Sequence, residues 1–396
     1  MADARGTPPR RFDLQIAYDD GAGYGKWHAT LLRPTATHAA GAVTTLKIMA
    51  LAALHERDTY ELADDEPILI EEPNYGGTGP IFEHAVVYAI GDTVLRKGSA
   101  GFDTTNGRYT SEGARLRFHG GLSRILRHFG LTEATVHLTI GINTERYRDL
   151  KTLVEQFYAA DHYFRGNGTE YRVHVGQVLS APQAWAAAKR IRVEPPESLA
   201  TMLAQSPIEE STTMVLDGGN FSLDATVLEP HETRAGVLVP QIMFAVTVGV
   251  HEIRQQLEEY LTSRLGQRPA LRTVERAMNP EPRNARFFGT VPDQTTGGVV
   301  DITPQLQAIR RSVWENAWTQ VRSRTRGIAA RYIVVVGGMG IVCAQEIAQT
   351  ELAQVHPSED RSLRLSDLPG FVNMLSEWTV VEGLALLGAE DVASIA

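Results

Sequence analysis

Apolar residues at alternate positions mark the first structured segment of the chain. Phe12, Leu14, Ile16 and Tyr18 occupy every second position, the pattern breaks at DDGAGYG, and it resumes as KWHATLL. A period of two is typical of a strand with one buried face. The pattern therefore predicts a β-hairpin over residues 12–32 with a glycine-rich tip.

The same arrangement occurs again about 200 residues later. The segment TTMVLDGGNFSLDATVL contains an apolar strand, a turn of small and polar residues, and an alternating return strand. A third segment, RYIVVVGGMGIVCAQEIAQ, reads as a buried strand, a glycine turn and a helix, because its apolar run is continuous. The chain thus contains three strands that each end in a glycine turn.

Strands and helices alternate between these segments. A helix through LSRILRHFG should end at Gly130, and the helix with apolar residues at 250, 253, 257 and 261 should end at Gly266. Further elements are expected at 136–140 (strand), LKTLVEQFYAA (helix), YRVHVGQVL (strand), APQAWAAAKR (helix) and the helix containing Leu306 to Ala317. This alternation predicts an α/β fold.

Residues 35–110 have a mixed pattern. AVTTLKIMALAALHE (42–56) predicts a helix, ELADDEP is acidic, and AVVYAI reads as a short strand. We expect a small inserted subdomain here. The domain organisation expected for the whole chain is a first domain from residues 10–180 plus 336–396, and a second domain from residues 181–335.

Composition narrows the class of protein. The chain has 396 residues, 43% hydrophobic, and a formal net charge of −9, which argues against direct binding of nucleic acid through a broad basic face. The single cysteine, Cys343, excludes an internal disulfide and a thiolate metal cluster. The N-terminus lacks a signal-peptide core, and no apolar run reaches the length of a membrane span. We expect a cytoplasmic protein without membrane contact.

The glycine turns suit phosphate binding. Consecutive backbone N–H groups at a tight turn converge on an anion, and glycine permits both the dihedral angles and the close approach. Gly21, Gly23 and Gly25 fit this requirement in the first turn, and Gly218 and Gly219 fit it in the second. Taken singly, each turn is more often a plain strand connection; the order and spacing of all three favour a nucleotide site.

Charged residues at the strand ends supply the rest of that chemistry. Mg²⁺ is held by one or two carboxylates, often through water, so Asp19 and Asp217 predict a magnesium site. Lys26 can reach a β- or γ-phosphate as a point charge. The third turn, with Gly337 and Gly338, lacks bulky side chains and can lie against a nucleoside.

These segments resemble the nucleotide-binding motifs of a known superfamily. YDDGAGYGK, VLDGGNFSLD and VVVGGMG are similar to the phosphate-1, phosphate-2 and adenosine motifs shared by actin, sugar kinases and DnaK-type chaperones. DDG followed by a lysine, together with PGFVNMLSEWTVVEGL near the C-terminus, is most similar to the ParM/StbA group and its archaeal-actin relatives. The resemblance implies an actin-like fold, in which two related α/β domains face each other across an interdomain nucleotide cleft.

The resemblance also implies roles for individual residues. Asp19 and Asp217 would lie near magnesium, and Lys26 would contact phosphate. Gln183, at the start of a helix, would orient the attacking water; its alternative is an ordinary first-turn helix residue. The residues implied to contact the nucleotide are Asp20, Gly21, Ala22, Gly23, Tyr24, Lys26, Gly218, Gly219, Asn220, Gly337, Gly338 and Met339. Phe221 and Met339 depart from the family pattern.

The implied function is nucleotide-dependent self-assembly. ATP, with GTP as the alternative, would be the substrate with Mg²⁺ and ADP the product, and the filament would segregate plasmid DNA through a DNA-binding adaptor. Two alternatives remain open: a small-molecule kinase of the same fold, and a structural filament with little hydrolysis. The acidic run 61–72 and the arginines of the helix near residue 310 are either solvated faces or filament contacts.

Overall fold

The chain forms two compact units. The first contains Met1–Ala186 and Val380–Ala396, and the second contains Ala187–Thr379. The computed structural model describes residues 12–21, 24–49, 52–54, 68–76, 79–82, 85, 87–91, 108–193, 195, 210–233, 238–280, 284–293, 297–326, 328, 330–350, 364–367, 371–373 and 378–395.

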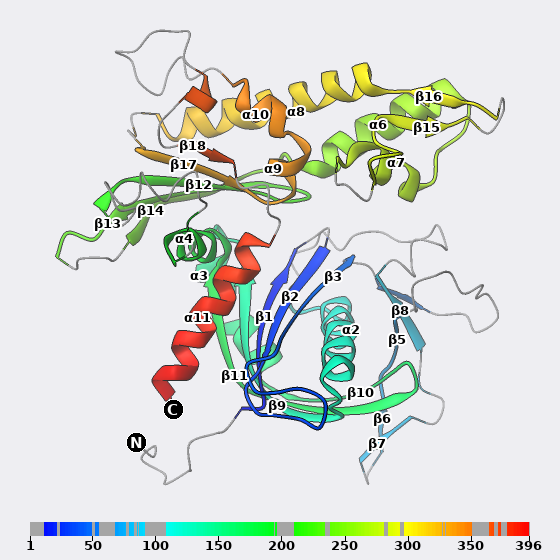
Figure 1. Ribbon diagram of the computed structural model, residues 1–396, viewed down its shortest axis with the longest axis vertical. Helices are drawn as coiled ribbons and strands as arrows, with labels where there is room; N and C mark the ends of the chain where they lie inside the picture. The colour runs from blue at the N-terminus through cyan, green and yellow to red at the C-terminus, as the bar shows by residue number, and fades with distance from the viewer. Residues whose placement is uncertain are drawn as a thin grey trace. The chain divides into compact units, whose positions relative to one another are not determined.

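The first unit is built on a mixed sheet, whose nine described strands lie in the order β3-β2-β1-β9-β11-β10-β5-β8-β4 (Figure 1). Separately, β6 (Asn74–Gly76) pairs with β7 (Gly79–Ile81). The strands of the large sheet are β1 (Leu14–Asp20), β2 (Tyr24–Leu31), β3 (Val43–Met49), β4 (Ala52–Leu54), β5 (Ile68–Glu71), β8 (Val87–Ile90), β9 (Glu133–Ile142), β10 (Asp161–Gly166) and β11 (Thr169–Pro182).

Helices cover both faces of this sheet (Figure 1). The long helix α2 (Glu112–Phe129) contacts β2, β3, β5, β8 and β10 and lies inside the curl of the sheet. Ser111 caps its first turn. Gly130, at φ 68, ends the helix, as predicted. On the other face lie α3 (Tyr147–Tyr158), the start of α4 (Gln183–Val193) and the C-terminal helix α11 (Thr379–Ile395).

The strand β1 is buried along its whole length because both of its faces are covered. Leu14, Ile16 and Tyr18 point into the core against α2. Gln15 points the other way, and its Nε2 donates to the backbone oxygen of Ala385 on α11 at 2.6 Å. The period of two in the sequence therefore separates one apolar row from one polar row.

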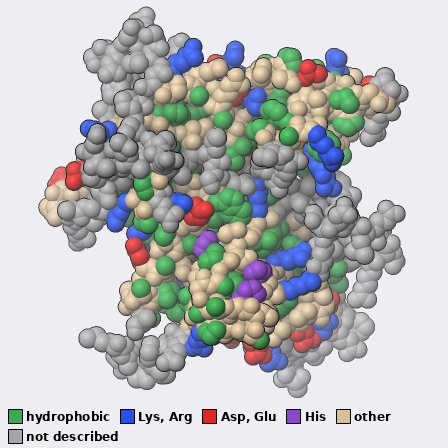
Figure 2. Space-filling model, in the orientation of Figure 1, with side chains coloured by type: hydrophobic (Ala, Val, Ile, Leu, Met, Phe, Trp, Pro, Cys, Tyr) green, Lys and Arg blue, Asp and Glu red, His purple; other side chains and the backbone are tan. Residues whose placement is uncertain are grey.

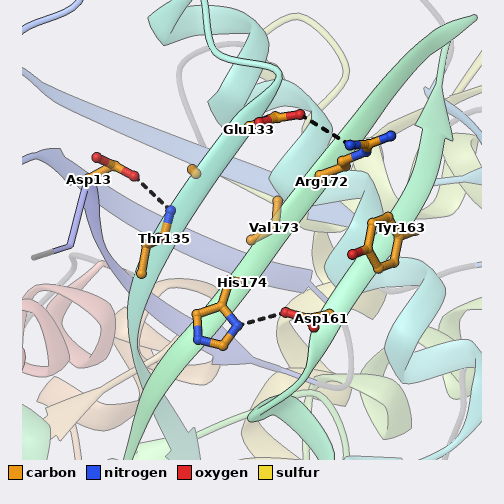
Figure 3. Close-up of a pocket in the computed structure, with 9 residues that line it drawn as sticks. Asp13, Glu133, Thr135, Asp161, Tyr163, Arg172, Val173 and His174 are labelled. Carbon is orange, nitrogen blue, oxygen red and sulfur yellow. Dashed lines mark hydrogen bonds and ion pairs between the residues drawn. The ribbon is translucent and has the colours of Figure 1, made fainter. Parts of the chain in front are cut away.

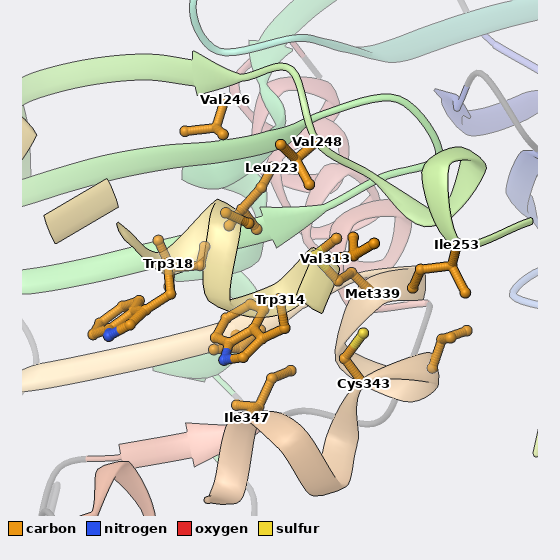
Figure 4. Close-up of a cluster of buried hydrophobic side chains, with 14 of the residues drawn as sticks. Leu223, Val246, Val248, Ile253, Val313, Trp314, Trp318, Met339, Cys343 and Ile347 are labelled. Carbon is orange, nitrogen blue, oxygen red and sulfur yellow. The ribbon is translucent and has the colours of Figure 1, made fainter. Parts of the chain in front are cut away.

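The second unit contains a five-stranded mixed sheet in the order β14-β13-β12-β17-β18. Its core packs α6, α8 and the short α9 and α10 on this sheet, around Trp314, Trp318 and Cys343 (Figure 4). Its elements are β12 (Thr213–Gly218), β13 (Leu223–Pro230), β14 (Leu238–Val246), α6 (Val250–Leu265), α7 (Leu271–Met278), β15 (Thr290–Pro292), β16 (Val299–Asp301), α8 (Thr303–Arg324), β17 (Tyr332–Val336), α9 (Gly338–Val342), α10 (Ala344–Ala348), η3 (Leu365–Asp367) and β18 (Phe371–Asn373).

The two units repeat one strand topology. In β3-β2-β1-β9-β11 the successive pairings are antiparallel, antiparallel, parallel and parallel. In β14-β13-β12-β17-β18 they follow the same sequence. The expected mixed α/β class is confirmed. The repeat places Asp19 and Asp217 near the ends of corresponding central strands.

The expected helix over 42–56 is wrong. Val43–Met49 forms β3, which pairs with β2, and Ala52–Leu54 forms β4. The β-branched residues Val43, Thr44, Thr45 and Ile48 favour a strand, and the neighbouring β2 supplies backbone partners that a local pattern does not reveal. The acidic residues 61–67 lie outside the described residues.

The observed division of the chain also differs from the expected one. Of the described strands between 35 and 110, β3, β5, β8 and β4 extend the same sheet as β1, and β6 and β7 form a separate two-stranded sheet. Residues 336–379, expected in the first domain, fall in the second unit, because β18 pairs with β17 and α9 packs on β12. Gln183, which the expected division placed in the second domain, lies in the first unit.

Candidate functional site

The first hairpin brings three of the predicted residues together. Asp19 lies opposite Lys26 across β1 and β2, and Lys26 Nζ is 3.4 Å from Asp19 Oδ2. Gln183 Nε2 donates to Asp19 Oδ1 at 2.6 Å. Asp19 is 3% exposed and Gln183 is 6% exposed, so this polar cluster is held in place from several sides. Two of its members are separated by 164 residues in the sequence.

A glycine that the motifs did not single out completes this cluster. Gly141 on β9 lies beside Asp19 in register. A Cβ at this position would be 3.2 Å from Gln183 Cγ and 3.6 Å from Asp19 Oδ1. The nearest atom to such a Cβ is Leu384 Cδ1 at 3.0 Å, so alanine would be tight against Leu384 and Gln183 and in ordinary contact with Asp19. The only sequence signal is a glycine near the end of a buried strand, TIGIN.

Asp20 points away from this cluster, because successive residues of a strand face opposite sides. Its carboxylate accepts hydrogen bonds from Tyr18 Oη at 2.7 Å and from Arg117 Nη2 at 3.2 Å. Arg108 Nη2 donates to the Asp20 backbone oxygen at 2.9 Å. Burial, together with the nearby Asp20 carboxylate, raises the pKa of Tyr18, which therefore stays neutral. We infer that Asp20 fixes the end of β1 rather than contacting a ligand.

The first turn is tight. Gly21 N donates to Asp19 O at 2.9 Å, and a Cβ on Gly21 would be 2.5 Å from the backbone oxygen of Tyr24. Glycine is therefore required by close approach of the backbone. Tyr24 begins β2, and its ring lies under Lys47 Nζ, 4.3 Å from the ring centroid. Ala22 and Gly23 lie outside the described residues.

The second hairpin has a different charge pattern. Asp217 lies directly opposite Asp224, and these residues are 8% and 5% exposed. Two carboxylates in this position repel each other, and a cation between or beside them relieves the repulsion. Hard oxygen donors of this kind suit Mg²⁺. Within the described part of the chain there is no group of three or more His, Cys, Asp or Glu residues that could hold a metal.

The third turn packs directly on the second. Gly337 has φ 85, and a Cβ there would lie 2.6 Å from both Asp217 Oδ1 and Gly218 O. A Cβ on Gly218 would lie 2.4 Å from Met339 Cβ. Met339 is fully buried in the core of the second unit, so the side chain that departs from the family pattern faces inward. The backbones of the second and third turns are therefore close together, as expected if both turns bind one ligand.

The second turn is oriented by helix α6. Gly219 O accepts from Val250 N at 3.3 Å, and Asn220 O accepts from His251 N at 2.7 Å. In a trans peptide the C=O and N–H groups point in opposite directions, so the amides of Asn220 and Phe221 point away from α6. Asn220 Nδ2 is buried and has no hydrogen-bond partner among the described residues. These donors fit a phosphate cradle.

An aromatic contact covers the tip of this second turn. The Phe221 ring lies 4.7 Å from the His251 ring. Burial and the neighbouring Arg254 lower the pKa of His251, so the imidazole is neutral near pH 7. The sequence marks Phe221 as a departure from the family pattern but does not reveal which side chain its ring contacts. Its partner belongs to the first turn of α6.

The polar hollow drawn in Figure 3 contains none of these residues. It has a volume of about 300 Å³ and lies on β9, β10 and β11 of the first unit. Its charged groups pair with each other, including His174 with Asp161 at 2.7 Å and Arg172 with Glu133 at 3.6 Å. We assign no function to it. Over the face of the molecule shown in Figure 2, acidic and basic side chains of the described residues are interspersed.

Comparison with solved structures defines the fold as actin-like. The chain matches a ParM filament from Clostridium botulinum over 96% of its length and 100% of that chain, with a TM-score of 0.67 and 14% identity. It matches an archaeal actin homologue over 95% and 99% of the two chains, with a TM-score of 0.65 and 13% identity. It matches Bacillus thuringiensis ParM with ATP over 96% and 99%, with a TM-score of 0.62 and 12% identity.

Sequence comparison adds no assignment: no family model matches the chain, and no curated protein matches it. The structural matches confirm the actin-like fold expected from the three glycine turns. None of the described helices is long and apolar enough to cross a membrane.

Proposed function

We propose that this chain is a polymerising actin-like ATPase. The observation that carries the proposal is the cluster of Asp19, Lys26 and Gln183 at the first turn, repeated in part by Asp217 and its glycines at the corresponding position of the second unit. The actin-like fold supports it, since one protein that shares this fold was solved as a filament and another was solved with ATP.

The residues fit a magnesium-bound triphosphate. Lys26 would contact a phosphate, and the second turn, at Gly218 and Asn220, would supply backbone N–H donors, whereas the Gly21 N–H donates to Asp19 O. The turn at 337–339 would lie against the nucleoside. When bound, Mg²⁺ would neutralise phosphate charge, with Asp19 and Asp217 as its proposed protein carboxylates.

Gln183 would position the attacking water. An amide has a donor end and an acceptor end. Its Nε2 donates to Asp19, which leaves Oε1 as the acceptor for a water proton. Phosphoryl transfer to water depends on positioning and charge neutralisation more than on a strong base, so this fixed acceptor suffices. Asp19 therefore orients Gln183 in addition to its proposed role near the metal.

Assembly and cargo form the finer part of the proposal. The chain would form cytoplasmic filaments with other copies of itself, stable with ATP and weakened after hydrolysis to ADP. Plasmid copies would be moved through a DNA-binding adaptor, because a chain of net charge −9 is poorly suited to holding DNA directly.

Right-angle light scattering tests the proposal. Purified full-length chain with Mg²⁺ should scatter more after ATP is added and then lose signal as phosphate is released. The Asp217→Ala variant should show neither change. Asp161→Ala, an exposed residue of the polar hollow, is the matched control and should behave as the natural chain. Absence of any rise across nucleotides, salts and protein concentrations would refute polymerisation.

A structural filament with little hydrolysis is the second candidate. The contact of Phe221 with His251 favours it, because a bulky ring at the tip of the second turn can slow the entry of water or the release of phosphate. Scattering that rises with ATP while phosphate release stays at background would select this candidate. Recovery of release in Phe221→Ser would show that the ring is the cause.

A further inference from the structure

Helix α4 begins directly after a proline. The first backbone N–H groups of a helix have no partner within the helix, and a Ser, Thr, Asp or Asn just before the helix usually accepts from one of them. In this chain the preceding residue is Pro182, whose ring carries no hydrogen-bonding group. Strand β11 leads straight into α4 at this point, so a cap for its first turn has to come from another segment.

Thr144 supplies that cap. Its Oγ1 accepts a hydrogen bond from Ala184 N at 3.2 Å, although the two residues lie 40 positions apart in the sequence. Ala184 is the second residue of α4, and its N–H is one from which a local capping side chain would accept. Thr144 is 1% exposed, so this hydrogen bond is shielded from water. The segment that follows β9 therefore caps α4.

The turn that contains Thr144 is itself well defined. The side chain of Asn143 accepts at Oδ1 from Glu145 N at 3.0 Å and from Arg146 N at 3.3 Å. Asn143 N donates to the Tyr109 hydroxyl oxygen at 2.8 Å, and Tyr109 is buried. An Asn side chain that accepts from the following backbone fixes a tight turn. Thr144 is therefore held at one position beside α4.

The capped residue is the neighbour of Gln183. Gln183 is the first residue of α4, and its Nε2 donates to Asp19 Oδ1. The direction in which its side chain leaves the backbone depends on the first turn of the helix, and Thr144 fixes that turn at Ala184. The cap and the bond to Asp19 therefore hold the two ends of one residue, its backbone and its amide.

We infer that Thr144 is a positioning residue for Gln183. The inference rests on the proposed function, in which Gln183 orients the attacking water, and deepens it. Without the cap the first turn of α4 would fray and the amide oxygen of Gln183 would move. A displacement of about 1 Å at a reacting group can lower a rate by about 100-fold. Nucleotide binding depends on other residues and should change little.

Phosphate release and calorimetric binding of Mg-ATP by the full chain test the inference. Thr144→Val, which removes the hydroxyl with little change of shape, should lower phosphate release about 10-fold and leave Kd within about 2-fold. Thr144→Ser keeps the acceptor and should restore release to within about 2-fold of the natural chain. Ser111→Ala is the matched control, because Ser111 Oγ accepts from Ala114 N in the first turn of α2, also at 3.2 Å; it should leave release unchanged.

A double variant separates positioning from a general structural role. If Thr144 acts through Gln183, Thr144→Val combined with Gln183→Ala should release phosphate at the same rate as Gln183→Ala alone, because no amide is left to misplace. A further loss of about 10-fold in the double variant would show that Thr144 acts independently of Gln183, and the inference would be wrong.

Hydrogen exchange of the nucleotide-free protein gives a readout that does not depend on activity. In Thr144→Val the amides of residues 184–188 should exchange about 10-fold faster, with those of α2 unchanged. Protection of the buried strand β1 reports whether the variant is folded. If Thr144→Val does not fold, Asn143→Ala should serve instead, because it keeps the hydroxyl but loosens its turn; exchange should rise and phosphate release should fall, each by about 3-fold. Unchanged exchange in α4 would overturn the inference.

Failure of the inference and failure of the proposed function are distinguishable. If Gln183→Ala lowers phosphate release and Thr144→Val does not, only the inference fails. If the natural chain releases no phosphate from ATP, or if Gln183→Ala releases it as fast as the natural chain, the proposed role of Gln183 fails and the inference fails with it.

Discussion

The two hairpins of this protein share a backbone plan and differ in charge. In the first, Asp19 lies opposite Lys26, and Gln183 at the start of α4 donates a hydrogen bond to the Asp19 carboxylate. In the second, Asp217 faces a like-charged residue, Asp224. The first hairpin therefore places opposite charges across its two strands, whereas the second places two like charges opposite each other. One strand plan thus carries two different charge patterns.

Removing the carboxylates should have the largest effect. Asp217→Asn and Asp19→Asn should each reduce phosphate release by about 100-fold to 1,000-fold, because a fixed charge at the reacting phosphates is lost. Asp161→Asn on the exposed sheet face is the control. A variant that retains release within 3-fold of the natural chain would remove that hairpin from the proposed chemistry.

Substitution of the glycine packed beside each hairpin, Gly141 at the first and Gly337 at the second, should change stability by different amounts. Gly337→Ala should lower the free energy of unfolding by about 3 to 4 kcal/mol, because a Cβ would meet backbone and Asp217 at an unfavourable positive φ. Gly141→Ala should cost only about 1 kcal/mol, since the nearest atom is the end of the flexible Leu384 side chain. Urea unfolding measures both.

A control separates strain from close contact in this comparison. Gly41 has φ 86, and a Cβ there meets nothing within 4 Å, so Gly41→Ala should cost about 1 kcal/mol from strain alone. Equal losses at Gly337 and Gly41 would show that the packing of the second turn on the third is not what makes glycine necessary.

Acid should weaken the first unit through buried histidines. His119 Nε2 and His162 Nδ1 are 3.1 Å apart between α2 and β10, and burial lowers the pKa of His162 to about 3. The unfolded chain then binds a proton first, so this stabilisation is complete above about pH 6.5 and declines as the pH falls toward 3. The expected loss between pH 7 and 4.5 is about 2 to 3 kcal/mol.

Urea midpoints recorded across this pH range check the histidine prediction. His162→Gln should flatten the profile between pH 7 and 4.5. His174→Gln, whose side chain is 47% exposed, should leave it unchanged. An equally steep decline in His162→Gln would assign the acid sensitivity to other groups.

The smallest expected effect is the change in stability when single charged residues are replaced in the nucleotide-free protein. Without nucleotide or Mg²⁺, Lys26→Met should destabilise the chain by about 1 to 2 kcal/mol, because it removes the ion-pair partner of the buried Asp19. Asp224→Asn should leave stability unchanged or slightly raised, because it removes a like charge opposite Asp217. Equal losses of stability in Lys26→Met and Asp224→Asn, measured by urea unfolding, would contradict the proposed difference in charge pattern between the two hairpins.

The sequence by itself determined the local features. A period of two identified both hairpins, and glycine positions fixed the turns and the ends of α2 and α6, because these depend on neighbours a few residues away. The resemblance of the three glycine turns to known nucleotide-binding motifs implied the actin-like fold that the structural comparisons confirm. The individual roles of the site residues stay predictions.

Tertiary structure decided everything that depends on partners distant in the chain. Val43–Met49 and Ala52–Leu54 are strands because they pair with β2 and β8, although the apolar spacing of this part of the sequence also fits a helix. The contact of Gln183 with Asp19, the inward direction of Asp20 and the alignment of Lys47 with Lys26 all follow from sheet register and from which elements cover each face. A linear pattern specifies which side chains alternate, but only the assembled sheet specifies what each one meets.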